Sequence, residues 1–241
     1  MARIPNSVLR ILRPMNYYRF LLWRIKILQI SIHSRIVNRG LTKSGKRGLF
    51  LDCGSNIGQG FEFFRQYYPN KLYDYVLFEP NPYCFDVLTK KYSGLVDQGV
   101  QIRNVAVGID NGEIDFFGLE VGKGGIYSVG GTVLPEHNSK MYAVPNSASM
   151  KVPSIDFADF LSAILDRNDY SMVILKLDIE GGEYPVIDSL VSNDLISKFG
   201  TIYVEFHSQY MSSAFATNYR HREKVFFKYS KRVGTRVIRW I

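Results

Sequence analysis

The stretch from Leu49 to Gly58, which reads Leu-Phe-Leu-Asp-Cys-Gly-Ser-Asn-Ile-Gly, constrains the fold of this chain more than any other. Three apolar residues followed directly by a glycine-spaced turn are typical of a buried parallel strand that ends at a ligand. Gly54 and Gly58 let the backbone approach a bulky group where a Cβ atom would collide. The phenylalanines within residues 61–64 then predict a helix packed on the sheet. Strand, turn and helix together predict a doubly wound α/β fold that holds a nucleotide at the mouth of its first strand.

A second apolar run, Tyr75–Phe78, predicts the next parallel strand, and it ends in Glu79-Pro80-Asn81-Pro82. A carboxylate at this strand end, about twenty residues beyond the glycine turn, is placed to accept hydrogen bonds from ribose hydroxyls. The two prolines stiffen the turn, and a helix over Tyr83–Tyr92 is expected to follow.

The remaining apolar segments continue the alternation of strands and helices. In chain order they predict a strand at Val100–Val107, an antiparallel strand at Glu113–Gly118, a helix at Phe157–Leu165, a strand at Met172–Leu177, a helix at Tyr184–Val191, a strand at Thr201–Phe206 and a last strand at Arg236–Ile241. Residues 120–150 are rich in Gly, Ser and Asn. An irregular insertion of this length in a compact domain is usually functional, so we expect it to face the substrate.

Polar side chains follow four of the predicted strands. They are Asp52, Glu79, the cluster Asp178, Glu180 and Glu183, and the pair Glu205 and His207. In an open α/β sheet such strand ends meet at one crevice. A carboxylate among like charges has a raised proton affinity, which suits a general base. We therefore expect Asp178 or His207 to act as the base, with Glu180 and Glu183 orienting the acceptor or a metal ion.

Asp178, Glu180 and His207 are also candidate ligands of a divalent cation. Carboxylate oxygens with one imidazole suit Mg, Mn or Ca better than zinc. Carboxylates at a strand end often cap helices or pair with basic residues instead. A divalent metal is therefore compatible with the sequence but is not predicted from it.

The net charge of +8 is unevenly distributed along the chain. Residues 1–48 carry eleven Lys and Arg and no acid, residues 49–218 carry eleven against twenty-one Asp and Glu, and residues 219–241 carry eight against one. We expect residues 1–48 to be a basic, helical leader with a linker from Arg39, and residues 49–241 to be the folded domain with its insertion at 120–150. Basic ends on an acidic body suit an anionic partner.

Within the leader, the apolar run Tyr17–Ile32 is interrupted by Arg19, Arg24 and Lys26. It is too short and too charged to span a bilayer. Such a segment can lie on an anionic membrane surface, pack on its own domain, or pack on a second copy of the chain. A peripheral membrane contact and a homodimer thus stay open, and a nucleic acid is the less favoured partner.

Cysteine usage and the N-terminal sequence bear on location. Cys53 and Cys84 are the two cysteines, so no disulfide framework follows. The leader lacks the small-residue cleavage pattern of a secretory signal. We expect a cytoplasmic protein, with membrane association through the leader left open.

Several motifs in order resemble the FkbM type of S-adenosylmethionine-dependent methyltransferase. The resemblance covers about Leu49 to His207 and rests on five segments: Leu51-Asp52-Cys53-Gly54-Ser55-Asn56-Ile57-Gly58, Phe78-Glu79-Pro80-Asn81-Pro82, Asn104-Val105-Ala106-Val107-Gly108, Ile155-Asp156 and Leu175-Lys176-Leu177-Asp178-Ile179-Glu180-Gly181-Gly182-Glu183. Asn56 stands where the broader methyltransferase pattern has a middle glycine, as is usual for the FkbM type.

The resemblance implies a Rossmann-like, mostly parallel seven-stranded class I methyltransferase sheet. It also implies methyl transfer from S-adenosylmethionine to a hydroxyl of a sugar, glycan or natural product, so the expected partner is a small-molecule or glycan acceptor. The implied cofactor-binding residues are Asp52, Cys53, Gly54, Ser55, Asn56 and Gly58 at the methionine part, Glu79 at the ribose hydroxyls followed by Pro80 and Asn81, Asn104, Val105 and Ala106 at the adenine, and Asp178 beside the methyl group or the acceptor oxygen.

Two other functions fit parts of the sequence. A nicotinamide-dependent dehydrogenase would use the same crevice, but Asn56 stands at its second glycine position, and Tyr67 and Lys71 enclose Pro69 and come too early for a catalytic Tyr-x-x-x-Lys pair. A non-catalytic methyltransferase-like module could instead bind RNA or an anionic membrane through the basic ends, with the aromatic-basic tail from Asn218 stacking on bases.

Overall fold

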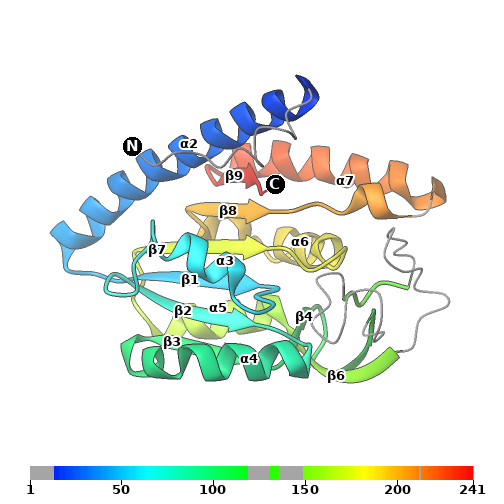
Figure 1. Cartoon of the computed structure of the whole chain (residues 1–241), viewed down its shortest axis with the longest axis horizontal. Helices are drawn as coiled ribbons and strands as arrows, with labels where there is room; N and C mark the ends of the chain where they lie inside the picture. The colour runs from blue at the N-terminus through cyan, green and yellow to red at the C-terminus, as the bar shows by residue number, and fades with distance from the viewer. Residues whose placement is uncertain (1–13, 119–130, 136–148, 212, 241) are drawn as a thin grey trace.

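The central sheet of the described residues has six parallel strands in the order β3-β2-β1-β7-β8-β9 (Figure 1). Their bounds are β1 Gly48–Cys53, β2 Tyr73–Phe78, β3 Val100–Arg103, β7 Met172–Leu177, β8 Thr201–Val204 and β9 Arg236–Arg239. The structure is a computed structural model, and it describes residues 14–118, 131–135, 149–211 and 213–240. The inner strands β1 and β7 are nearly continuous apolar runs buried on both faces, as is usual in parallel sheets.

One predicted strand, Val100–Val107, is in fact two. The chain leaves the central sheet after β3, and β4 (Ala106–Gly108) joins a second sheet of order β4-β6-β5 with β5 (Gly112–Phe117) and β6 (Ser149–Asp156). In this sheet β6 is parallel to β4 and antiparallel to β5. The side-chain amide of Asn104 fixes this break, since it donates to the backbone oxygens of Glu79 at 2.8 Å and Pro80 at 3.1 Å. The mostly parallel α/β sheet is confirmed, with six strands rather than the seven expected.

Helices cover both faces of the central sheet, as expected of a doubly wound fold. The helices are α2 Pro14–Ser44, α3 Gln59–Phe64, α4 Pro82–Tyr92, α5 Phe157–Arg167, α6 Glu183–Ser192 and α7 Ser213–Arg232, with short 3₁₀ helices at Ser93–Gln98, Ile196–Lys198 and Ser208–Tyr210. Alternate residues of β1 point to opposite faces. Leu49 and Leu51 belong to the core under α5, α6 and α7, and Phe50 belongs to the core under α2, α3 and α4.

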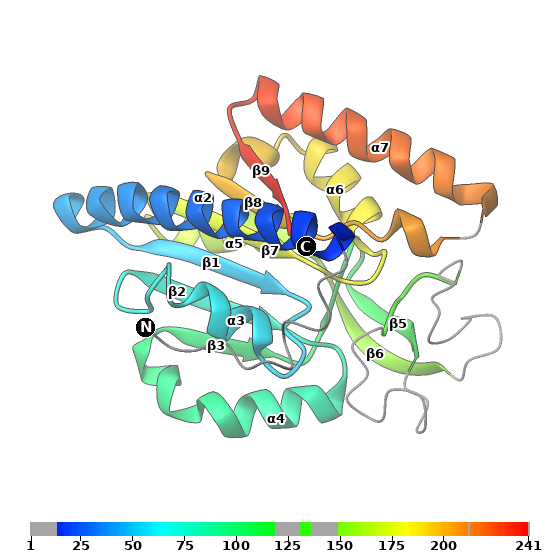
Figure 2. The same cartoon turned by 45° about the horizontal axis from the view of Figure 1, so that its top comes forward.

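Helix α2 lies across the second of these cores, beside β9 in both Figure 1 and Figure 2. Its Ile30 and Leu41 are buried in that core. The Asn38 side chain donates to the backbone oxygen of Tyr67 at 2.8 Å. The helix continues to Ser44, so the linker expected from Arg39 shrinks to the few residues before β1.

The basic tail from Asn218 lies mostly within α7, which packs Tyr219 and Phe226 into the core. The last strand, expected at Arg236–Ile241, is observed as β9 at Arg236–Arg239. In the part of the chain that the structure describes, no helix is long and apolar enough to cross a membrane.

Candidate active site

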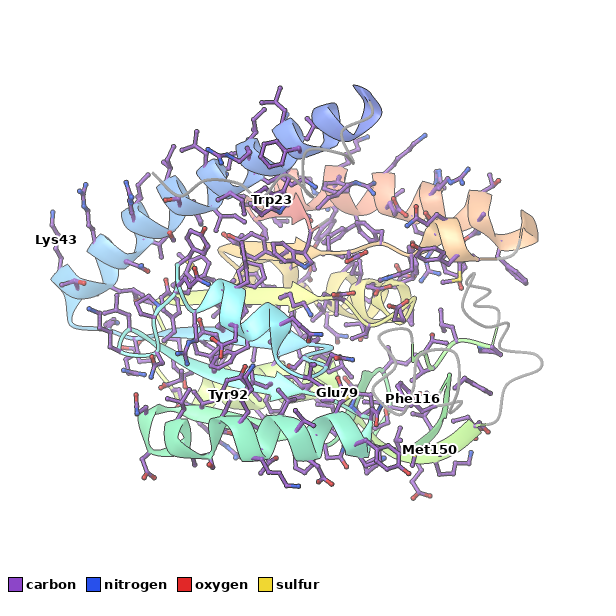
Figure 3. The ribbon with its side chains drawn as sticks, viewed as in Figure 1. Trp23, Lys43, Glu79, Tyr92, Phe116 and Met150 are labelled. Atoms are coloured by element: carbon purple, nitrogen blue, oxygen red, sulfur yellow. The ribbon has the colours of Figure 1, made fainter. Side chains whose placement is uncertain are left out.

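A cavity of about 480 Å³ lies at the carboxyl ends of the central strands, and we call it the strand-end cavity. It is lined by Trp23, Gly54, Ser55, Asn56, Gln59, Gly60, Phe63, Phe78, Glu79, Pro80, Val105, Ala106, Val107, Phe116, Gly131, Val133, Lys176, Asp178, Ile179, Glu180, Glu205 and Trp240. In Figure 3, Glu79 and Phe116 lie toward the side of the molecule where the central strands end, and Trp23 lies just below the ribbon of α2. The cavity thus lies where open α/β sheets bind their ligands.

The turn after β1 is held in shape by two glycines that contact protein atoms. Gly54 has φ +81°, and a Cβ there would lie 1.9 Å from the backbone oxygen of Asp178. Gly58 has φ +95°, and a Cβ there would meet the Tyr92 ring. The expectation that both glycines make room for a ligand is therefore incomplete. Gly54 lines the cavity, but each glycine is required first by the left-handed backbone and by its close protein neighbour.

Glu79 joins the ends of β1 and β2. Its Oε2 accepts a hydrogen bond from the backbone N–H of Asn56 at 2.7 Å, and its Oε1 accepts one from that of Asn81 at 2.9 Å. The side chain is 5 % exposed and lines the cavity. Burial raises the pKa of Glu79 to about 7, although the two backbone hydrogen bonds favour the ionised form.

Lys176 is a buried cation for which no role was predicted from the sequence. The parallel register sets it opposite Asp52, and its Nζ lies 3.2 Å from Asp52 Oδ1, 3.3 Å from Asp178 Oδ2 and 2.7 Å from the Gly54 oxygen, to which it donates. Burial alone lowers the pKa of Lys176, but the attraction of Asp52 and Asp178 outweighs it and keeps the ammonium charged. The sequence signal for this buried cation is a lysine inside the otherwise apolar run Met172–Leu177.

Glu183 holds the loop after β7 and one histidine in place. Its Oε1 accepts from the Ile179 N–H at 2.7 Å, and its Oε2 accepts from the Gly181 N–H at 2.8 Å. The same Oε1 lies 3.0 Å from Nδ1 of His207. Gly181, with φ +104°, allows the expected turn between Asp178 and α6. Glu183 is fully buried, so it positions other groups.

His207 faces three carboxylates with its other nitrogen. Nε2 lies 3.4 Å from Glu180, 3.8 Å from Asp178 and 4.0 Å from Glu205. Burial alone lowers the pKa of His207, but the charge and hydrogen bond of Glu183 and the charges of Glu180 and Asp178 raise it to about 10. At neutral pH the ring is therefore an imidazolium, which cannot accept a further proton.

Glu205, like Glu79, is a cavity carboxylate with a raised proton affinity. Burial, together with the charge of Asp178, raises the pKa of Glu205 to about 7. A group with this pKa changes charge in the range where a general base works best.

Comparison with known proteins identifies the family. The model of the methyltransferase FkbM domain matches residues 52–231. This chain belongs to the FkbM methyltransferase family. Among solved structures, the methyltransferase FkbM from Methylobacillus flagellatus KT is similar at 11% identity and a TM-score of 0.43, over 75% of this chain and 37% of that chain. The chain thus spans well under half the length of that structure. A comparison with curated proteins finds no match.

Most site residues that the sequence predicted, or that the FkbM resemblance implied, lie at the strand-end cavity. Those that line it are Gly54, Ser55, Asn56, Glu79, Pro80, Val105, Ala106, Asp178 and Glu180. Asp52, Cys53, Gly58, Asn81, Asn104 and His207 are not among the lining residues. Cys53 points into the core, Asn81 caps α4 through the Tyr83 N–H, and Asn104 shapes the end of β2.

Several lining residues of this FkbM-family site had no local sequence signal. Trp23, Phe63 and Trp240 come from α2, α3 and the end of the chain. From the expected insertion at 120–150, the described residues Gly131 and Val133 line the cavity, and Thr132 Oγ1 donates to the backbone oxygen of Glu180 at 2.5 Å. The other residues of that insertion, apart from 131–135 and 149–150, lie outside the described residues.

The three candidate metal ligands do come together, since one ligand atom each from Asp178, Glu180 and His207 lies within 4.8 Å of the others. The His207 imidazolium already supplies a positive charge between the carboxylates. We therefore expect EDTA to leave methyl transfer unchanged, and added Mn²⁺ to shift Tm by no more than about 1 °C. Thermal melts and turnover with EDTA and with Mn²⁺ check this. A Tm that rises with Mn²⁺ in wild type but not in Glu180→Gln would contradict it.

Proposed function

We propose that this FkbM-family methyltransferase transfers a methyl group from S-adenosylmethionine to a hydroxyl of a sugar, a glycan or a small natural product. One observation carries the proposal: a single cavity joins Glu79, held by two backbone N–H groups, to the carboxylates Asp178 and Glu205. Glu79 suits the ribose of the cofactor, and the pair Asp178 and Glu205 suits an acceptor hydroxyl that must lose a proton.

The residues present fit the cofactor. The cavity volume of about 480 Å³ falls within the roughly 300–1,000 Å³ usual for small-molecule sites. Each carboxylate oxygen of Glu79 accepts one backbone N–H and has a further lone pair for a ribose hydroxyl. Phe78, Val105 and Ala106 add apolar surface beside it, which suits a flat base. When bound there, S-adenosylmethionine supplies the electrophilic methyl group.

Glu205 is the general base in this proposal. Lys176 and His207 both lie close to Asp178 and hold its carboxylate at the cavity, whereas burial and the charge of Asp178 raise the pKa of Glu205 to about 7. We therefore assign Asp178 to orienting the acceptor hydroxyl and Glu205 to taking its proton as the oxygen–methyl bond forms. His207 holds the carboxylates of Asp178, Glu180 and Glu205 in place. His207, one of the two bases expected from the sequence, takes a positioning role in this proposal, because the neighbouring carboxylates raise its pKa and favour the imidazolium.

The direct test is methyl transfer from labelled S-adenosylmethionine to a panel of sugars, glycans and phenols. We expect a methoxy product, identified by its NMR signal, and S-adenosylhomocysteine in equal amount. Methylation at nitrogen or carbon would contradict O-methylation. A folded protein that binds no S-adenosylmethionine with or without acceptor would favour the non-catalytic module instead.

The proposal predicts a pH dependence for turnover. Because the base must be ionised, kcat is expected to rise with pH up to the Glu205 pKa of about 7 and to level off above it. Glu205→Gln should lower kcat by about 10²-fold or more and leave the affinity for S-adenosylmethionine nearly unchanged. The exposed Glu113→Gln serves as the control. A Glu205→Gln enzyme with wild-type kcat would refute this assignment.

A further inference from the structure

Helix α2 has a second apolar face that the domain does not cover. Leu21, Ile25, Leu28, Ile32 and Ile36 follow one another at intervals of four and three residues, so they form one stripe along the helix. Their side chains are between 44 % and 64 % exposed. We call these five residues the outer stripe. Among the described residues, eight of the thirteen large apolar side chains that are exposed lie on α2.

The outer stripe faces away from the fold. Ile30, Ser34 and Leu41 are buried against the domain, and they lie on the side of the helix opposite to residues such as Leu28 and Ile32. His33 also contacts the domain, with Nε2 2.8 Å from Thr201 Oγ1. The helix is therefore fixed by one face, and the apolar character of the other is not needed for this packing.

The charges around the outer stripe favour an anionic partner. Exposed cations flank or continue it at Arg24, Arg35, Arg39 and Lys43, and residues 1–48 hold no acid. An exposed apolar stripe bordered by Arg and Lys is typical of helices that lie in a bilayer interface and are attracted by anionic lipids. A two-fold contact between copies of this face would bring the same cations together, which disfavours self-association.

We propose that α2 docks on an anionic phospholipid bilayer, with its outer stripe inserted at the level of the headgroups. The long stems of Arg24 and Arg35 can bury beside the stripe while their guanidinium groups reach lipid phosphates. The helix lies parallel to the surface in this arrangement, because the outer stripe runs along its length.

Docking by α2 also brings the active site to the membrane. Trp23 belongs to α2 and lines the strand-end cavity together with Phe63 and Trp240 (Figure 3). A helix with its side chains is about 10–12 Å across, so the rim of the cavity lies about one helix diameter from the lipid surface. A sugar that projects from the bilayer on a lipid carrier comes within reach at that distance.

Binding of the 241-residue chain to vesicles tests the docking. We expect it to sediment with vesicles of phosphatidylglycerol and phosphatidylcholine in equal parts, and not with vesicles of phosphatidylcholine alone. Binding should weaken as salt is raised, because the charge attraction is screened. The double variant Leu28→Glu/Ile32→Glu should reduce binding by about tenfold or more, since it places carboxylates in the interface.

Val225→Glu is the matched control, because Val225 is a comparably exposed apolar residue on a different helix, α7. It should bind vesicles like wild type. Equal binding of wild type and the Leu28/Ile32 variant to anionic vesicles would overturn the proposal, as would the absence of binding. A dimeric wild type that becomes monomeric in this variant would also overturn it in favour of a second copy. Affinity for S-adenosylmethionine, measured in parallel, reports on the proposed function separately.

Discussion

Replacing Lys176 by methionine is expected to lower the free energy of unfolding by about 3–5 kcal/mol, the usual cost of leaving a buried charge without its partner. The methionine keeps the length and apolar stem of the side chain but removes the ammonium group. Asp52, which is fully buried, would then lie in the core without the cation 3.2 Å away. Asp178 would lose a contact of 3.3 Å, but it is partly exposed and can be solvated.

Guanidinium denaturation of wild type and variant measures this loss. Lys46→Met is the matched control, because its ion pair with Asp169 is exposed and such pairs contribute about 0–1 kcal/mol. The double variant Lys176→Met/Asp52→Asn should recover part of the stability, since it removes the unpaired charge. A loss in Lys176→Met no larger than that in Lys46→Met would show that the buried pair does not hold the site together.

The loss should also depend on pH. Without Lys176, the buried Asp52 carboxyl has its folded-state pKa raised above the unfolded value by desolvation. A raised folded pKa means that stability is present at low pH and is lost as pH rises through that pKa. The difference between Lys176→Met and wild type is therefore expected to be smaller near pH 5 than near pH 8, which denaturation at both pH values checks.

The sequence predicted those parts of the site that depend on local pattern. The strands β1, β2 and β7 are continuous apolar runs, and Glu79 and Asp178 follow their ends directly, so a parallel sheet brings them to one edge. The ion pair between Asp52 and Lys176, in contrast, depends on the register of β1 against β7. That register joins residues more than a hundred positions apart, and no local pattern contains it.

Other parts of the site depend on contacts between distant segments. The break between β3 and β4 is fixed by hydrogen bonds from Asn104 to residues about 25 positions earlier. Trp23 and Trp240 both line the cavity because α2 lies beside β9, the strand that ends just before Trp240 (Figure 2). The proton affinity of His207 results from Glu183, Glu180 and Asp178 together. A lone histidine in a sequence does not reveal whether its surroundings make it a base or a cation.

Glu79→Gln is expected to weaken binding of S-adenosylmethionine by about a hundredfold, since hydrogen bonds to a charged group contribute about 1.5–3 kcal/mol each. The amide keeps the size of the side chain and one oxygen. It also sets an NH₂ group against a backbone N–H, because both carboxylate oxygens of Glu79 now accept such bonds, from Asn56 and Asn81. Calorimetric titration of the folded variant measures the change.

Glu205→Gln is the matched control for this experiment, because both glutamates line the cavity and both have a pKa raised to about 7. It should bind S-adenosylmethionine like wild type, since Glu205 is assigned to the acceptor. Equal losses in the two variants would show that the cavity lacks the proposed division into a ribose side and an acceptor side. No loss in Glu79→Gln would remove the ribose contact from the proposal.

Because the pKa of Glu79 is raised, the proposed contact between Glu79 and the ribose hydroxyls should depend on pH. Ribose hydroxyls donate to the ionised carboxylate, and below its pKa of about 7 the free protein holds a proton there. Affinity for S-adenosylmethionine should thus fall as pH drops from 8 to 6, and this component should be missing in Glu79→Gln. The sign is opposite for folding: protonated Glu79 is favoured in the folded state, so its contribution to stability is present at low pH and is lost as pH rises toward 7. Desolvation of the ionised Glu79 carboxylate therefore costs stability above pH 7, in the same pH range in which the proposed ribose contact is strongest.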